Sequence, residues 1–143
     1  KIWKSRAGMA QSIATCPYYP VWEKTAQKDS DTMKELVIKK DFSAVGKLAE
    51  FNALKMHATM MTTQPPILYW HPVTMEIMQD IITWRDEGIE SYFTIDAGPQ
   101  VKILCLEKNE HKLVRRLNDI KGIEKIESCK AGPDAKILEK HLF

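Results

Sequence analysis

Asp96 is the carboxylate in this sequence whose surroundings best suit chemistry. It follows residues 91–95, whose aromatic and β-branched side chains predict a buried strand, and it precedes Ala97, Gly98 and Pro99. A strand fixes the direction of the carboxylate, and a glycine turn lets a ligand approach the backbone closely. The competing interpretation is that Asp96 only bonds the amides of its own turn.

Two further candidates lie earlier in the chain. Ser5 and Arg6 stand beside Gly8, and a hydroxyl and a guanidinium can both donate to phosphate oxygens. The pair is therefore either an anion site or an ordinary solvated surface. His57 lies among apolar residues of a predicted helix, so it is either a core histidine or a catalytic base.

Metal and nucleotide motifs are missing from the sequence. None of the four histidines stands three or four residues from another histidine or a cysteine in a ligand pattern, so no metal site is predicted. The usual phosphate-loop, dinucleotide and nucleophile-elbow strings are also absent. The three cysteines include no C-x-x-C spacing, which favours reduced thiols in the cytoplasm.

The composition indicates an ordinary globular protein. The chain has 143 residues, 44% of them hydrophobic and 28% charged, which excludes fibrous and disordered classes. A net charge of +2 argues against a nucleic-acid partner, and no apolar run is long enough to cross a membrane. The chain begins without a Met or a signal core, so we expect it to be cut from a longer protein.

The elements that must position the candidate residues are predicted from periodicity. Residues 5–9 and 10–15 suggest a turn and a short strand, and residues 21–40 suggest one or two helices. Asp41 is expected to cap a long central helix that runs to about residue 61. Next come a helix that begins at Pro72 and ends at Gly88, and two strands over 91–95 and 101–106. The last elements expected are a helix that Asn109 caps and Gly122 ends, and a strand over 123–129.

This order of elements predicts an α+β fold. Helices come first and are followed by strand, turn, strand, helix and strand. The arrangement expected is a ferredoxin-like layer sandwich, with helices packed on a mainly antiparallel sheet.

Four short strings stand out when they are taken together and in order. They are SRAGM at 5–9, MHAT at 56–59, PPILYW at 65–70 and YFTIDAGP at 92–99, and they span about two thirds of the chain. Together they resemble the C-terminal half of the diphosphomevalonate decarboxylases. That family belongs to the kinases of small metabolites such as galactose, homoserine, mevalonate and phosphomevalonate.

The resemblance implies a reaction that needs ATP and magnesium. The C3 hydroxyl of mevalonate 5-diphosphate is phosphorylated, and phosphate and CO2 then leave to give isopentenyl diphosphate. Asp96 matches the family's catalytic aspartate, which either takes the proton of that hydroxyl or orients it and stabilises positive charge at C3. Ser5 and Arg6 match residues that bind the diphosphate, and Met9 matches a residue of the pocket wall.

Other positions of the resemblance support or limit it. His57 and Gly98 match motif residues that lie behind the pocket. Gln100 departs from the family, which commonly has Asn at this position. The ATP-binding loop, lysine and arginine of the family belong to an N-terminal half that this sequence lacks. Residues 1–143 are therefore expected to be the C-terminal substrate-binding domain of a two-domain enzyme, and to be inactive alone.

The resemblance further implies a homodimer in the cytoplasm, with the N-terminal half and the substrate as partners. Two alternatives stay open. One is a relative that decarboxylates phosphomevalonate, or that phosphorylates C3 of mevalonate without decarboxylation. The other is a non-catalytic ferredoxin-like module for binding or dimerisation.

Overall fold

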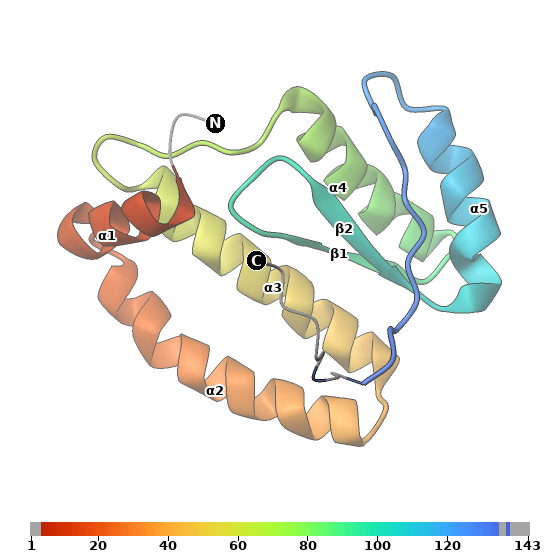
Figure 1. Cartoon of the computed structure of the whole chain (residues 1–143), viewed down its shortest axis with the longest axis horizontal. Coiled ribbons are helices and arrows are strands. Elements are labelled where there is room, and N and C mark those ends of the chain that lie inside the picture. The colour runs from red at the N-terminus through yellow and green to blue at the C-terminus, as the bar shows by residue number, and fades with distance from the viewer. Residues whose placement is uncertain (1–3, 135–136, 138–143) are drawn as a thin grey trace.

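The computed structural model describes residues 4–134 and residue 137. Within these residues, helices form two groups on either side of a small sheet (Figure 1). The elements in chain order are α1 (Ser5–Thr15), α2 (Tyr19–Ile38), α3 (Phe42–Met61), α4 (Pro72–Asp86), β1 (Ser91–Ile95), β2 (Val101–Cys105) and α5 (Glu107–Asn118).

The sheet consists of β1 and β2, which pair antiparallel with Ile95 opposite Val101. Successive side chains of a strand point to opposite faces. Phe93 and Ile95 accordingly lie in the apolar core with α4 and α5, whereas Tyr92 packs against α3. The expected α+β class, with helices packed on an antiparallel sheet, is confirmed.

Helix α3 is the central helix, as predicted, and it lies between α2 and β1 (Figure 1). The Asp41 side chain caps it by accepting a hydrogen bond from the Ala44 amide at 3.0 Å. Gly46 allows α3 to approach the sheet, because a Cβ there would lie 2.0 Å from the Tyr92 ring. The predictions of α2 as a helix, of α4 and of both strands are also confirmed.

The first segment of the chain corrects the sequence prediction. Residues 10–15 are not a strand but part of α1. The buried residues of α1 are Gly8 and Ser12, four positions apart, while the apolar Met9 and Ile13 are exposed. The buried face of α1 consists of small residues and not of large apolar ones. The sequence therefore lacks the apolar periodicity by which a helix is usually recognised.

The last described segment corrects two further predictions. Asn109 does not cap α5, which begins two residues earlier; it is buried within the helix and its Nδ2 donates to the Glu90 carbonyl at 3.0 Å. Residues 123–129 form no strand. Ile123 and Ile126 both pack against the main core, and residues three apart on a strand face opposite sides.

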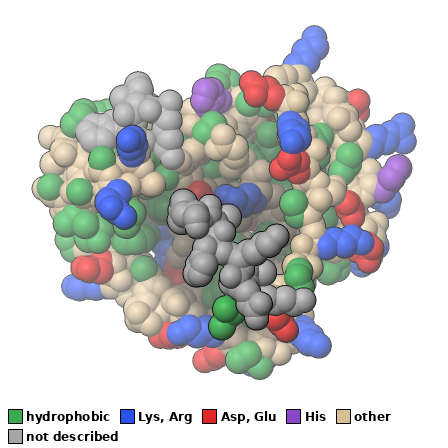
Figure 2. Space-filling model, in the orientation of Figure 1, with side chains coloured by type: hydrophobic (Ala, Val, Ile, Leu, Met, Phe, Trp, Pro, Cys, Tyr) green, Lys and Arg blue, Asp and Glu red, His purple; other side chains and the backbone are tan. Residues whose placement is uncertain are grey.

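The surface carries charges of both signs. On the face shown in Figure 2, Lys and Arg side chains are interspersed with Asp and Glu. Within the described part of the chain, no helix combines the length and apolar character needed to span a membrane. The three cysteines are free thiols: Cys16 is buried, Cys105 half-buried and Cys129 exposed.

Candidate functional site

A groove of about 470 Å³ lies where α1, α2, α3 and the end of β1 meet. It brings together three of the residues predicted from the sequence, Ser5, Met9 and Asp96. Its other lining residues are Ser12 and Ile13 from α1, Tyr19 and Trp22 from α2, Met56, Thr59 and Met60 from α3, and Ala97. The groove is thus mainly apolar, with hydroxyls and one carboxylate along it.

Asp96 stands directly after β1 and reaches into solvent, with 83% of its side chain exposed. Its carboxylate forms an ion pair with Lys102, which lies across the turn on β2. The turn itself is closed by the backbone, because the Gly98 amide donates to the Asp96 carbonyl at 2.7 Å. The carboxylate therefore contacts Lys102 and not the amides of its own turn.

The loop that carries Asp96 is anchored at both ends. At its beginning, His57 Nε2 donates to the Ile95 carbonyl across 3.3 Å. At its end, the buried Thr74 hydroxyl donates to the Pro99 carbonyl at 3.0 Å. These two contacts tie the loop to α3 and α4, so its backbone is held by two helices.

Helix α1 presents its N-terminus to the groove through Ser5, its first residue. The first amides of a helix have no partners within it and carry partial positive charge, which suits an anion. Arg6 lies on the same turn, exposed and outside the groove lining. Within residues 4–134, the Arg6 guanidinium has no acidic partner.

Small residues place α1 against the end of α3 and the segment after it. A Cβ on Gly8 would lie 3.2 Å from the Tyr69 hydroxyl, so the helix approaches closely there. The Thr63 hydroxyl donates to the backbone of α3 and so accepts from the Ser12 hydroxyl, at 2.8 Å. These contacts direct the first turn of α1 toward the groove.

His57 and Gly98 lie behind the groove and do not line it. Burial lowers the pKa of His57 below its ordinary value of 6.5. Hydrogen bonding to the backbone of Ile95 and Asp96, together with the nearby Asp96 charge, opposes this shift but does not outweigh it. Burial thus favours the neutral form of the ring. Gly98 is buried under Gln100, because a Cβ on Gly98 would lie 2.5 Å from the Gln100 Oε1.

Several groove residues were not singled out from the sequence. Ser12 and Ile13 follow Ser5 and Met9 at helical spacing, and would have been found had α1 been predicted as a helix. Met56 and Met60, one turn apart on α3, are interpreted from the sequence as packing residues; they pack in a small apolar cluster and also line the groove. Two more residues of the groove, Tyr19 and Trp22, lie on α2. The buried Nε1 of Trp22 has no hydrogen-bond acceptor among the described residues.

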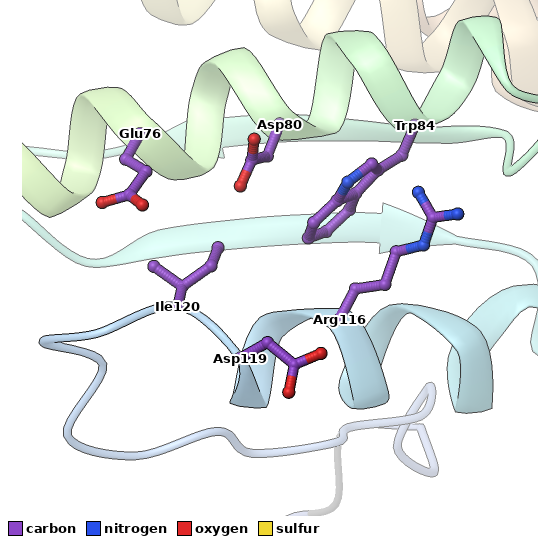
Figure 3. Close-up of a pocket in the computed structure, with 6 residues that line it drawn as sticks. All are labelled: Glu76, Asp80, Trp84, Arg116, Asp119 and Ile120. Atoms are coloured by element: carbon purple, nitrogen blue, oxygen red, sulfur yellow. The ribbon is translucent and has the colours of Figure 1, made fainter.

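A second hollow, of about 350 Å³, lies between α4 and α5 (Figure 3). Its charged lining is mostly acidic, with Glu76, Asp80 and Asp119. The guanidinium of Arg116 lies over the Trp84 ring, 5.5 Å from its centre, and is paired with Glu87. This hollow contains none of the predicted site residues, and its net negative charge does not suit a phosphorylated ligand.

A helix N-terminus that opens onto a groove can bind an anionic group of a small molecule, and a carboxylate at the end of a neighbouring strand is a candidate reactive group. The model of the mevalonate 5-diphosphate decarboxylase C-terminal domain matches residues 1–141. The chain belongs to that family.

Individual relatives agree with the family match. Diphosphomevalonate decarboxylase of Debaryomyces hansenii is 28% identical over 132 residues, which are 87% of this chain and 34% of the relative. The structure of mevalonate pyrophosphate decarboxylase from Streptococcus pyogenes is 38% identical and has a TM-score of 0.78, over 82% of this chain and 37% of that one.

A further solved structure is MDDEF in complex with MVAPP, AMPPCP and magnesium. It is 36% identical, with a TM-score of 0.80, and the match covers 85% of this chain and 37% of that one. The chain therefore spans about one third of the length of the relatives it matches.

Proposed function

We propose that this chain is the C-terminal, substrate-binding domain of an ATP-dependent decarboxylase. The full-length enzyme would convert mevalonate 5-diphosphate to isopentenyl diphosphate, CO2, ADP and phosphate. The observation that carries this proposal is the shared groove: Ser5 at the N-terminus of α1 and Asp96 at the end of β1 line it together. The ATP-binding half would lie outside residues 1–143.

The diphosphate would bind at the N-terminus of α1. The amides of the first turn, the Ser5 hydroxyl and the Arg6 guanidinium are donors for its oxygens. From there the substrate would extend along the groove toward Asp96. Met9 and Met56 would contact its methyl and methylene groups, because thioether side chains adapt to irregular apolar shapes.

Asp96 would act at C3, the carbon that reacts. The C3 hydroxyl oxygen would lose its proton, to Asp96 or to solvent, and form a bond to the γ-phosphorus of ATP as the bond from that phosphorus to ADP breaks and ADP leaves. The C3–O bond then breaks with release of phosphate, and the bond to the carboxylate breaks so that its electron pair forms the C=C bond as CO2 leaves. A negative charge beside C3 orients the hydroxyl and stabilises the positive charge that develops there.

ATP and magnesium would be held mainly by the other half of the enzyme. The groove offers a single carboxylate, Asp96, and magnesium sites usually combine one or two carboxylates with substrate phosphates. Among the described residues, no group of three or more histidine, cysteine, aspartate or glutamate side chains could hold a metal ion. Residues of this domain fit the substrate's diphosphate better than a nucleotide.

The decisive test is CO2 release by the full-length protein that carries this chain. With ATP and magnesium, the wild type is expected to release CO2 from mevalonate 5-diphosphate. Asp96→Asn is expected to lower kcat about 10² to 10³-fold, because a charge aimed at the developing cation is lost. Asp80→Asn, the same change in the hollow between α4 and α5, is the matched control.

Calorimetric titration separates catalysis from binding. Asp96→Asn should bind mevalonate 5-diphosphate within a few-fold of wild type, since the diphosphate site is intact. Activity that survives in Asp96→Asn would refute the role of Asp96. A wild type that binds the diphosphate but releases no CO2 would favour the non-catalytic module, and preference for phosphomevalonate would favour that relative.

Arg6 provides a complementary test of the diphosphate site. Arg6→Ala is expected to weaken binding of mevalonate 5-diphosphate about tenfold, the loss of one charge-assisted contact. Arg115→Ala, an exposed arginine on α5, is the control. A homodimer and a cytoplasmic location stay predictions, which light scattering and cell fractionation can check.

A further inference from the structure

His57 is buried directly behind the catalytic loop, with 2% of its surface exposed. It lies in α3, and the segment after that helix packs against its ring. The Trp70 ring centre is 4.7 Å from the imidazole centre, and Tyr69 meets it edge-on at 6.4 Å. Two aromatic side chains therefore limit how far the imidazole can turn.

The hydrogen bond of His57 has a defined direction. Its Nε2 lies 3.3 Å from the carbonyl oxygen of Ile95, and a carbonyl can only accept. Nε2 must therefore carry the proton of the neutral imidazole. This selects one of the two tautomers of His57.

This bond acts on Asp96 through one peptide group. The carbonyl of Ile95 and the amide nitrogen of Asp96 belong to the same planar unit. When the direction of the Ile95 carbonyl is fixed, the orientation of the bond between the amide nitrogen and the Cα of Asp96 is fixed as well. The Asp96 side chain starts from that Cα. Ile95 is also the last residue of β1, so beyond it the strand ladder no longer restrains the chain.

Other contacts of Asp96 restrain it less. Lys102 pairs with the carboxylate, but both side chains are more than half exposed, and ion pairs in water are weak and easily screened. The Gly98 amide holds the Asp96 carbonyl from within the same turn, so it cannot fix the turn relative to the rest of the domain. Thr74 anchors the far end of the loop, at Pro99.

We propose that His57 is a positioning residue for Asp96: its Nε2–H donor fixes the peptide between Ile95 and Asp96, and so sets the direction in which the Asp96 side chain leaves the backbone at the edge of the groove. This inference rests on the proposed function for its kinetic effect. Its structural part, a donor that sets the loop geometry, stands by itself. The ring contacts of His57 serve to hold that donor in place.

Two substitutions separate the donor from the ring. His57→Gln keeps an amide N–H at about the position of Nε2 but removes the aromatic ring. His57→Phe keeps the ring between Tyr69 and Trp70 but removes the donor. In the full-length enzyme, positioning predicts that His57→Phe lowers kcat about 10 to 100-fold, since small misplacement of a catalytic group has effects of this size.

His57→Gln should retain kcat within about threefold of wild type, and KM for mevalonate 5-diphosphate should change little in either variant, because the proposed diphosphate donors lie on α1 and not on the loop. His111→Gln, at an exposed histidine of α5, is the control. The reverse order, with His57→Phe active and His57→Gln impaired, would overturn the proposal and leave His57 a packing residue.

NMR provides a readout that does not depend on activity or on a stable variant. In wild-type protein with ¹⁵N-labelled histidine, His57 should show the Nε2-protonated neutral tautomer near pH 7. The Nδ1-protonated tautomer would refute the hydrogen bond. If the proposed decarboxylase function is wrong, the full-length protein will release no CO2, but His57 will still show the Nε2-protonated tautomer. Failure of the proposed function can therefore be distinguished from failure of the His57 proposal.

Discussion

The two sides of α3 are packed in different ways. Toward the sheet, α3 meets β1, and beyond β1 lies a continuous apolar core formed with α4 and α5. Toward α2, α3 lies against a neighbouring helix that has half-buried residues but no fully buried one. It is tied to α3 by polar contacts: Asp29 accepts from Asn52 and pairs with Lys55, which also reaches Thr25.

The contrast between the two sides of α3 explains how the candidate site is built. Asp96 directly follows β1, whose position is fixed by burial of Phe93 and Ile95 in the apolar core with α4 and α5. The other walls of the groove come from α1, α2 and α3. The site thus combines a carboxylate that directly follows a firmly held strand with helices that leave apolar side chains exposed, Val21, Val37 and Ile38 of α2 among them.

The largest expected effect is in the core on the α4 side. Ile81 is fully buried, at 0% exposure, and Ile81→Ala is expected to lower the free energy of unfolding by about 2 to 5 kcal/mol, through lost burial and a cavity. Its neighbour Ile82 is 45% exposed, so Ile82→Ala is the matched control. Urea denaturation measures both. Equal losses would show that the core is not where stability is concentrated.

An intermediate effect is expected between α2 and α3, at Asp29. Burial raises the pKa of Asp29, but bonds from Lys55 and Asn52 outweigh it, and the pKa falls below its ordinary value of 3.8. Asp29→Asn should therefore lower the free energy of unfolding at pH 7 by about 1 kcal/mol.

The pH dependence gives the sign of that contribution. Because the folded-state pKa is the lower one, the stabilisation is complete well above pH 3.8. It is lost as the pH falls through the folded-state value. The stability difference between wild type and Asp29→Asn should vanish in strong acid, whereas Asp134→Asn, at an exposed aspartate, should show little difference throughout. A difference that persists in strong acid would contradict this account.

The smallest effect is expected on the outer face of α2. Val37 is 57% exposed, so Val37→Ser should change the free energy of unfolding by no more than about 0.5 kcal/mol. The measurement is again urea denaturation. A loss of more than about 1 kcal/mol in the free energy of unfolding of the full-length protein would show that α2 is buried there. The contrast between the two sides of α3 would then hold only for this domain taken alone.

Much of the fold could be predicted because its signals are local. The Asp41 cap, the glycine after α4 and the apolar runs of the two strands each depend on residues close in sequence, and each prediction is confirmed. The same holds for the placement of Asp96 after β1. Its catalytic role stays a prediction.

Other features could not be predicted because distant residues decide them. Asn109 looked like a helix cap, but it is buried where it can donate to Glu90, and nothing near it in sequence indicates that partner. Trp22 gave no signal of its own, since it lines the groove only because α2 folds back beside α3.

The family resemblance, the central helix and the carboxylate after β1 could all be inferred from the sequence, because they depend on short strings and local periodicity. That residues 5–15 form a helix, and that its first residue lines the same groove as Asp96, is visible only in the folded structure. The physical reason is that α1 buries Gly8 and Ser12 against Tyr69 and Thr63, and such small residues become a buried face only when their distant partners are in place.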